Sequence, residues 1–484
     1  MLSLLESLTG RRDAERAKAL LAQIAELQSE VLELQGEVKN LVQERDKLGA
    51  ENGQLRQRVA ELERSGKRQA TPFRREKQKT DPKPAGRRRG EGAFKHRPKP
   101  QPEEIDDTQE CRLTGCPHCG GEVQNVSEHE HFEVDIPPVK PVVIRYVTES
   151  GYCPCCQTQV SSRHQDQISA ATGAAAVVLG PRSKALAADL KHRLGLSYAK
   201  IADLMEEAFG LESHRSTWCQ ADQRLAAQAR SVYEDLLDVL RQSATAHVDE
   251  TGWRIGTLSA WLWVFTNQEV TVYTIAPSRG HEVVVEILGR SFAGVLVSDC
   301  FTAYDHKALA DWLKQKCLAH LLKDLTRLES EKTRGAVRFA RDVTQVLRQA
   351  LELEKQRDVL SPDDYAQLCE EVENRLDQLI HQERRFSDPD NLRLAKRLRK
   401  QRQHLLRFLY IEGLDATNNQ AERMLRPAVI TRKTGGCNRT DAGAEAHAIL
   451  SSILVTAKQR SIPILDLLIE IQRTGQPSPA LIPP

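Results

Sequence analysis

Three acidic residues that lie far apart in the sequence have the character of a two-metal site. Asp249 and Asp299 each end a run of mostly apolar or β-branched residues, and Glu422 lies in the second turn of an expected helix. Carboxylates are the hard oxygen ligands that divalent cations prefer. Two Mg2+ or Mn2+ ions about 3.5–4 Å apart activate a water or a DNA 3′-hydroxyl and stabilise the leaving 3′-oxygen. The three acids therefore predict cleavage and joining of phosphodiesters.

The elements around these acids predict a ribonuclease-H-like core formed by residues 240–330 and 411–460. In that topology the first and fourth strands end side by side, so Asp249 and Asp299 are expected to meet. Glu250 and Asp305 are the nearest competing acids. An isolated Asp at the end of a strand is more often a residue that only contacts solvent. The expected order is three meander strands, a helix, a parallel strand, a second helix and a last strand. The strands and the first helix are expected at residues 244–249, 261–266, 270–275, 280–288, 294–299 and 316–320.

Basic residues follow the third acid on its expected helix. Thr417 and Gln420 have the spacing of a capping box, so a helix is expected to start there and to carry Glu422. DNA phosphates are the expected partners of four cations in this helix, Arg423, Arg426, Arg432 and Lys433. Cys317 and His320 have zinc-ligand spacing, but two ligands are half a site. We interpret that pair as structural residues, or as residues that contact the three acids without binding the metal ions themselves.

The bulk composition indicates a multidomain protein that is mainly α with one α/β core. A chain of 484 residues is too long for a single hydrophobic core. The net charge of +2 is close to neutral, but residues 67–100 carry 13 Lys or Arg against 3 acids. Residues 67–110 are therefore expected to be a disordered basic linker that contacts DNA phosphates nonspecifically. A solvated spacer is the alternative.

Residues 1–66 are expected to form a leucine-zipper coiled coil. A leucine recurs every seven residues, and taking these leucines as d places Val31, Val38 and Asn52 at a. Leu at d with β-branched residues at a favours a parallel dimer, in which Asn52 sets the register. A lone amphipathic helix packed on its own protein is the alternative. The leucines are Leu20, Leu27, Leu34, Leu41, Leu48, Leu55 and Leu62.

Residues 111–165 predict a knuckle that binds one structural Zn2+. Two C-x2-C turns supply four thiolates, the number that a tetrahedral zinc site needs. Short strands are expected between the turns, at 133–136 and 142–147. The expected ligands are Cys116, Cys119, Cys153 and Cys156; Cys155 competes with them, and Cys111, His118, His129 and His131 are interpreted as bystanders. The alternative is a pair of reduced turns without metal.

Three further segments are expected to be helical. Residues 170–239 have the order helix, Gly-containing turn and helix: Ser197 is the expected N-cap of the first helix, Gly210 lies in the turn, and the second helix is expected from residue 216 to about 239. This order suits a helix-turn-helix that offers His214, Arg215 and Gln220 to DNA. Plain helical packing is the alternative. An insertion at 331–410 is charged and helical, and residues 461–484 are expected to form a C-terminal helix and tail.

The chain is expected to be cytoplasmic, and associated with the nucleoid when it is bound to DNA. No apolar run approaches the roughly 18 residues of a membrane span. The apolar run at the first residues is interrupted by a charged residue too early for a secretory signal. Eleven cysteines without an export signal indicate thiols and metal ligands rather than disulfides.

The chain resembles the DDE transposases of the bacterial IS66 family over nearly its whole length. The resemblance implies catalytic roles for Asp249, Asp299 and Glu422, and movement of an element with terminal inverted repeats. Cys300 departs from the family, which usually has a small residue there. The motifs that carry the resemblance are the two C-x2-C turns, Asp249-Glu250-Thr251, Ser298-Asp299 with Tyr304, Cys317-x2-His320, and Thr417 to Arg423 with Leu425-Arg426-Pro427 and Arg432-Lys433.

The sequence therefore predicts a transposase of an insertion sequence. It is expected to bind terminal inverted repeats and target DNA, to form a homodimer or a higher oligomer on DNA, and to act with or without accessory proteins of the same element. Two alternatives stay open at this point. One is a DNA-binding regulator or a domesticated, inactive homologue, and the other is a nuclease of the same fold that does not join strands.

Overall fold

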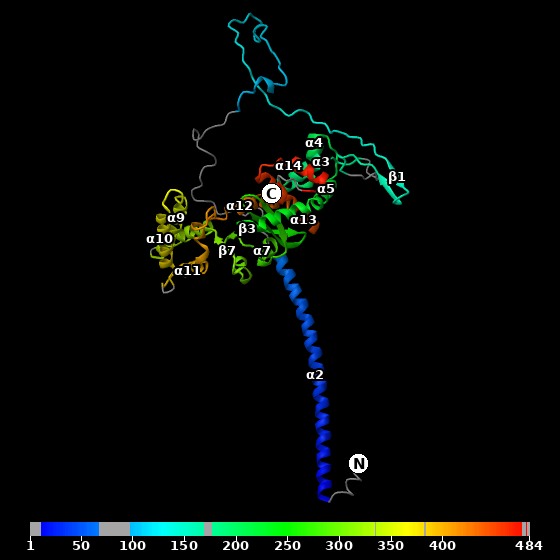
Figure 1. Ribbon diagram of the computed structural model, residues 1–484, viewed down its shortest axis with the longest axis vertical. Coiled ribbons are helices and arrows are strands. Elements are labelled where there is room, and N and C mark those ends of the chain that lie inside the picture. Colours follow the sequence, from blue (N-terminus) through cyan, green and yellow to red (C-terminus); the bar gives the residue numbers. More distant parts are fainter. Residues whose placement is uncertain are drawn as a thin grey trace.

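The computed structural model describes residues 11–66, 97–168, 177–333, 335–381, 384–476 and 481 (Figure 1). Most of the basic linker, at 67–96, lies outside the described residues, as does all of the tail after Gln476 except Leu481. No helix in the described ranges is both long enough and apolar enough to cross a bilayer.

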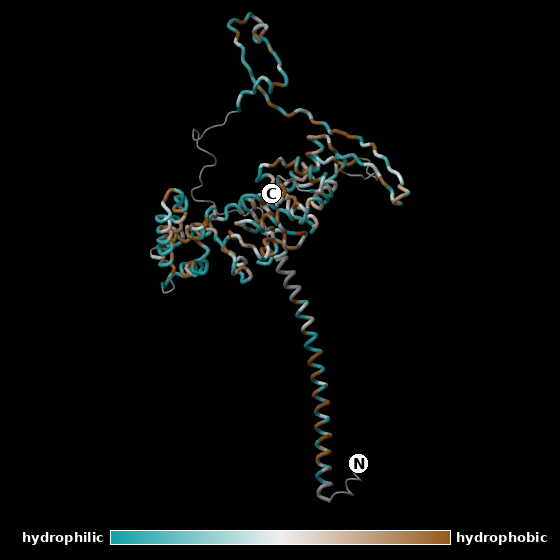
Figure 2. The backbone as a smooth tube through the Cα atoms, in the orientation of Figure 1, coloured by the Kyte–Doolittle hydropathy of each residue, from teal (hydrophilic) through white to brown (hydrophobic). Residues whose placement is uncertain are grey.

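The N-terminal segment forms one long helix, α2, from Arg11 to Gly66. Figure 1 shows α2 projecting away from the rest of the protein. The six heptad leucines from Leu20 to Leu55 are each more than half exposed, and the side chain of Leu62 lies outside the described residues. Figure 2 shows hydrophobic positions recurring along the length of this exposed helix.

The segment that carries the C-x2-C turns has little regular structure. A 3-10 turn η1 (Pro102–Glu104) precedes the first turn, and strands β1 (Ser150–Cys153) and β2 (Thr158–Ser161) form a hairpin around the second. The strands expected at 133–136 and 142–147 are wrong. Val134, Ile136 and Val142 are more than four-fifths exposed. With no neighbouring strand or core to bury them, their β propensity is not enough to form a sheet.

Four helices follow: α3 (Pro181–His192), α4 (Tyr198–Phe209), α5 (Arg215–Gln228) and α6 (Arg230–Arg241). Ser197 caps α4 as expected, because its side chain accepts from Lys200 N. Gly210 ends α4 in the left-handed region at φ 62°. The single helix expected after residue 216 is in fact two, divided at Ala229.

The central sheet has five strands in the order β5-β4-β3-β6-β7. The strands β3, β4 and β5 form an antiparallel meander, and β6 and β7 are parallel to β3. This strand order and these directions are those expected from the sequence. The helix expected between the last two strands is wrong, because two 3-10 turns lie there, and the last strand lies at 313–316 rather than at 316–320. The bounds are β3 (Thr245–Ile255), β4 (Leu258–Thr266), β5 (Thr271–Ala276), α7 (His281–Leu288), β6 (Val295–Ser298) and β7 (Leu313–Lys316), with 3-10 turns η2 (Thr302–Asp305) and η3 (Lys307–Leu309) before β7.

The two faces of the sheet pack against different helices. Ala246 and Val248 of β3 face a core that includes side chains of α3, α5 and α6, so the helical segment and the sheet share one core. Trp253 of β3 and Val264 of β4 face the other way, toward Leu425 of α12 (Asn419–Gly435). Because side chains alternate along a strand, the odd positions of β3 point toward α12.

Helix α13 (Asp441–Gln459) covers β5, which forms one edge of the sheet. Ser452 Oγ accepts from Tyr273 N at 2.8 Å, and Thr456 Oγ1 accepts from Thr271 N at 3.0 Å. These hydroxyls satisfy backbone donors of β5 that have no strand beside them, which removes an edge open to pairing. The last helix, α14 (Ile464–Thr474), packs on α3, where Gln472 donates to Pro181 O at 2.9 Å.

The insertion forms a second core beside the sheet. Its helices are α9 (Gly335–Glu354), α10 (Pro362–Ile380) and α11 (Pro389–Gln401), with 3-10 turns η4 (Arg402–His404) and η5 (Arg407–Leu409), and α8 (Leu318–Glu331), which follows β7, packs with them. Their buried side chains pack with Val295 and Val297 of β6. Figure 1 shows α9, α10 and α11 as a lobe at the side of the molecule.

Candidate functional site

Asp249 lies in the middle of β3, not at its end. The strand continues to Ile255 because Asp249 to Ile255 pair with β4. The parallel pairing with β6 stops earlier, at His247 with Val297. Asp249 therefore lies just beyond the last residue pair between β3 and β6, on the face of the sheet toward α12. Its Oδ1 accepts from Glu250 N at 2.9 Å.

Burial and neighbouring charges act on the Asp249 carboxyl. Burial, with the charge of Glu250 next, raises the pKa of Asp249 to about 7, and the charges of Asp299 and Glu422 add to the increase. Carboxylates that repel one another in a poorly solvated place resist ionisation unless a cation joins them. This electrostatic coupling is the clearest sign that the three acids lie around one place.

Asp299 follows the last residue of β6 directly, as expected for an acid at a strand end. Its Oδ1 accepts from Phe301 N at 2.8 Å, which orients the carboxylate. The fully buried Lys316 of β7 contacts Asp299 O at 3.1 Å and Ser298 Oγ at 3.3 Å. Lys316 thereby holds the turn that carries Asp299.

Glu422 lies in the first turn of α12, not in the second. The expected capping box of Thr417 and Gln420 is wrong, because Asn418 is the N-cap and Gln420 instead donates to Asn267 O. Glu422 N is bonded to Asn418 O at 3.2 Å.

Asn418 is the residue that joins α12 to the sheet. It is fully buried, and its Nδ2 donates to Val248 O at 2.8 Å. Its Oδ1 lies 3.3 Å from His247 Nδ1, and its N donates to Cys317 Sγ at 3.1 Å. These contacts place the start of α12 beside the rung that precedes Asp249. Asn418 is not among the residues that the sequence predicts for the site, although it lies within the motif from Thr417 to Arg423.

The two competing acids, Glu250 and Asp305, form hydrogen bonds and ion pairs with other side chains. Glu250 faces away from Asp249 across β3 and accepts from Arg279 Nε at 2.9 Å and from the buried Tyr304 hydroxyl. Arg279 in turn lies over the rings of Trp261 and Phe301, at 4.4 and 4.0 Å. Asp305 pairs with Lys316 at 3.1 Å and Lys400 at 2.8 Å.

Cys317 and His320 lie beside Glu422. Cys317 is the N-cap of α8 and is buried, and His320 lies in the first turn of that helix. His320 Nδ1 is 3.6 Å from Glu422 Oε1. In the part of the chain that the structure describes, these three residues form the one set of three or more His, Cys, Asp or Glu whose ligand atoms all lie within 4.8 Å of one another. Asp249, Asp299 and Glu422 are more widely spaced.

Cys300, the departure next to Asp299, packs against the apolar core of the insertion. Burial raises the pKa of the Cys300 thiol to about 11, so it is neutral at physiological pH. A neutral thiol turned toward apolar side chains does not compete with Asp299 for a metal ion.

The basic residues of α12 divide into two groups. Arg423, Arg426 and Lys433 are exposed, whereas Arg432 is half-buried and donates to Thr251 Oγ1 at 2.9 Å and to Gly252 O. Arg432 therefore connects α12 to β3 on the face that carries Asp249. Among the residues expected to read DNA, His214, Arg215 and Gln220 are exposed at the start of α5.

Each C-x2-C turn brings its own two thiols together. In the first turn Cys116 N donates to Gly121 O and Gly120 N to Cys116 O, both at 2.8 Å. Hydrogen bonds lower the pKa of Cys116, first from the His118 backbone and then from Cys119, and lower that of Cys156, first from Thr158 and then from Cys153. Each turn thus suits half a tetrahedral zinc site. Within the described residues the two turns are not in ligating distance of each other.

Comparison with known proteins decides the family. Residues 176–446, more than half of the chain, match the family model described as Transposase IS66 family. The chain belongs to that family. A second model, described as the zinc-finger binding domain of transposase IS66, matches residues 114–157.

A curated relative of this IS66-family chain is described as Uncharacterized protein y4qI, from Sinorhizobium fredii. It is 24% identical over 303 residues, an alignment that covers 56% of this chain and 55% of the relative. The chain therefore spans about half the length of the relative it matches.

The IS66 zinc-finger match supports a structural zinc in the segment of the two C-x2-C turns. Closing the two turns on one ion would give this segment the folding free energy that its exposed apolar residues do not supply. The IS66 match also covers every residue of the sheet and of α12, so the three acids lie inside the region that defines the family.

Proposed function

We propose that this IS66-family chain is the transposase of an insertion sequence, and that Asp249, Asp299 and Glu422 form its catalytic DDE triad. The chain would bind the terminal inverted repeats of its element and catalyse Mg2+-dependent strand cleavage and strand transfer. The single observation that carries the proposal is geometric. Asp249 and Asp299 each lie two residues beyond the paired residues His247 and Val297 of β3 and β6, and Asn418 at the start of α12 donates to Val248 O beside them.

The donor set fits two hard divalent cations. The ligands are carboxylate oxygens from β3, from the end of β6 and from α12, and burial makes the Asp249 carboxylate dependent on a positive partner. Two Mg2+ ions bound there would activate a water or a DNA 3′-hydroxyl and stabilise the leaving 3′-oxygen.

Residues of this chain would hold the acids and the DNA for that chemistry. Asn418 and Lys316 fix the positions from which Glu422 and Asp299 point. Arg423, Arg426 and Lys433 are exposed on the helix that carries Glu422, where they would bind the phosphates that flank the scissile bond.

Recognition of the element ends is proposed for the helices α4 and α5. Gly210 makes the turn between them, and Ile201 and Met205 of α4 pack on Trp218 of α5, so α5 is held rigidly. The start of α5 then offers His214, Arg215 and Gln220 to the major groove. The zinc ligands proposed are Cys116, Cys119, Cys153 and Cys156, and phosphate contacts are proposed for the linker.

The catalytic proposal is tested with purified protein, Mg2+ and labelled DNA that carries the ends of the element. Asp249→Asn, Asp299→Asn and Glu422→Gln are each expected to reduce cleavage and strand transfer by at least about 100-fold, because each removes an anionic metal ligand. Asp311→Asn is the matched control, since Asp311 is an exposed acid outside the site.

The cleavage products distinguish a transposase from a nuclease and from a DNA-binding protein without catalytic activity. Cleavage that is equally strong in all three variants and in the wild type would remove the triad from the mechanism. Hydrolysis without any strand-transfer product would indicate a nuclease. Binding of the ends without cleavage at any metal concentration would leave a regulator or an inactive homologue.

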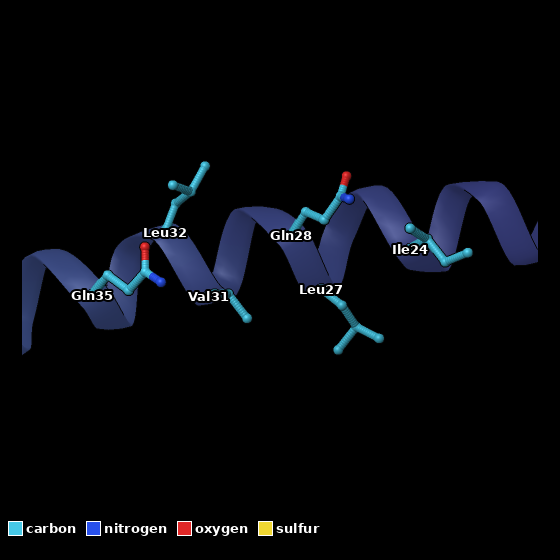
Figure 3. A pocket seen from close by; sticks show the side chains of 6 residues that line it. All are labelled: Ile24, Leu27, Gln28, Val31, Leu32 and Gln35. Carbon is cyan, nitrogen blue, oxygen red and sulfur yellow. The ribbon is translucent and has the colours of Figure 1, made fainter.

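Dimerisation is proposed for α2, whose heptad leucines from Leu20 to Leu55 are exposed. Figure 3 shows Leu27 and Val31 pointing to the same side of the helix, as neighbouring d and a positions must. The proposed seam runs along Leu20, Leu27, Leu34, Leu41, Leu48, Leu55 and Leu62, with Asn52 setting the register.

Deleting residues 1–66 is expected to convert the dimer into a monomer, so that the mass measured in solution is that of one shortened chain. The reason is that a helix with such a seam gains its stability by pairing with a second copy. Light scattering coupled to gel filtration measures the mass, and Asn52→Val tests the register. An unchanged number of subunits after the deletion would contradict the zipper.

A further inference from the structure

Glu422 belongs to two groupings at once. One is the set of three carboxylates, and the other is the tighter cluster with Cys317 and His320, whose ligand atoms all lie within 4.8 Å of one another. The cluster joins the start of α8 to the start of α12. Asn418 connects the same two places, because its N donates to Cys317 Sγ at 3.1 Å and its O accepts from Glu422 N at 3.2 Å.

The chemistry of this cluster differs from that of the three acids. A thiolate and an imidazole are the ligands of Zn2+ and similar transition metals, whereas Mg2+ prefers oxygen. A cysteine binds a metal ion through its thiolate sulfur. Three protein ligands with a fourth position open to water or another ligand are an arrangement that zinc adopts in proteins.

The geometry suits one ion. His320 Nδ1 and Glu422 Oε1 are 3.6 Å apart. Two ligands that each lie about 2.0–2.2 Å from a tetrahedral Zn2+ are separated by about that distance. Cys317 is fully buried, so its thiol is held in place, whereas His320 and Glu422 are half-exposed and open to an ion from solvent.

We propose that Cys317, His320 and Glu422 form a binding site for a single Zn2+ or similar transition-metal ion, separate from the structural zinc of the C-x2-C turns. Such an ion holds Glu422 toward α8. If Glu422 is a ligand of the catalytic Mg2+ ions, as the proposed function has it, the two kinds of metal compete for one carboxylate. Zn2+ bound by Cys317, His320 and Glu422 then inhibits strand cleavage.

Metal content tests the site without any assay of activity. The full-length protein is dialysed against micromolar free Zn2+, and the metal bound per chain is measured by atomic emission. The wild type is expected to hold one equivalent more than Cys317→Ser or His320→Ala. Because His320 is half-exposed, its variant keeps the test valid should Cys317→Ser fail to fold. Cys300→Ser is the matched control, since Cys300 lies near the acids but outside the cluster, and it is expected to keep both equivalents.

Cobalt substitution identifies the ligand. Tetrahedral Co2+ bound to a thiolate absorbs in the near ultraviolet and in the visible, and the spectrum of the wild type minus that of Cys317→Ser is expected to retain both bands. Equal zinc content in the wild type, Cys317→Ser and His320→Ala, with no difference spectrum, would overturn the proposal.

The competition is measured separately, as the ratio of cleavage with and without Zn2+ at fixed Mg2+ within each protein. Zinc is expected to inhibit the wild type at a concentration at least about tenfold lower than it inhibits His320→Ala. A protein that binds the extra zinc but never cleaves DNA would refute the proposed function and leave the metal site standing. Equal sensitivity of the two proteins would refute the competition alone.

Discussion

Asp249→Asn is expected to abolish strand cleavage and, at the same time, to stabilise the protein in the absence of Mg2+ at pH 8. The folded protein raises the pKa of Asp249 to about 7, from about 3.9 in an unfolded chain. The stability that goes with the neutral carboxyl is therefore fully present below about pH 4 and is lost as the pH rises through 7. Asparagine cannot ionise, so the variant avoids this loss.

The size of the effect follows from the same shift. Three pKa units correspond to an upper limit of about 4 kcal/mol, and local relaxation and solvent reduce the expected gain to about 1–3 kcal/mol. Thermal unfolding is measured at pH 5 and pH 8, with and without Mg2+, and without a chelator so that the zinc stays bound. The advantage of the variant is expected to shrink at pH 5, where most wild-type Asp249 is protonated.

Mg2+ is also expected to remove the advantage, because it stabilises the wild type by binding the folded state. Asp311→Asn, an exposed substitution with the same change of charge, is the control and is expected to change stability little at either pH. A variant that is less stable than the wild type at pH 8, or equally more stable at both pH values, would contradict the role of the Asp249 charge.

Asn418→Ala is expected to lower the free energy of unfolding by about 2–4 kcal/mol and to reduce cleavage strongly. The substitution leaves Val248 O without the 2.8 Å donor and removes the acceptor beside His247 Nδ1, both in a fully buried place. An unsatisfied buried polar group costs about 1–3 kcal/mol, and the lost side-chain volume adds to that. The start of α12, and Glu422 with it, then loses its attachment to β3.

Urea denaturation and the cleavage assay measure the two consequences of Asn418→Ala. Asn419→Ala is the matched control, because Asn419 is the next residue, carries the same side chain and is exposed. It is expected to change both quantities little. Equal behaviour of the two alanine variants would show that the Asn418 contacts do not position Glu422.

The local pattern of the sequence was enough to predict the order of the sheet. Alternation and apolar runs are properties of short segments, and three strands, a helix and two further strands leave few ways to arrange a mixed sheet. The second helix that was expected before the last strand is wrong, because two 3-10 turns lie there. The same kind of information predicted the N-cap Ser197, the Gly210 turn and the long helix α2. The strands at 133–136 and 142–147 failed because β propensity depends on a neighbouring strand that the local sequence does not contain.

The choice among neighbouring acids depended on long-range contacts. Asp249 and Glu250 are adjacent, and only the packing of β3 between two cores turns Asp249 toward α12 and Glu250 toward Tyr304 and Arg279. Asp305 competes with Asp299 in the local sequence, whereas in the fold it pairs with Lys316 and Lys400.

The sequence by itself determined which residue types this protein has for its chemistry: three acids in matching elements, two pairs of thiols, and a Cys and a His three positions apart in a short motif. Only the tertiary structure decided which of them meet. Glu422 is 105 residues from Cys317, and Asn418 is 170 residues from Val248, yet all four lie around the start of α12. The physical reason is that periodicity and capping act over a few residues, whereas the contacts that orient a carboxylate come from elements that packing brings together.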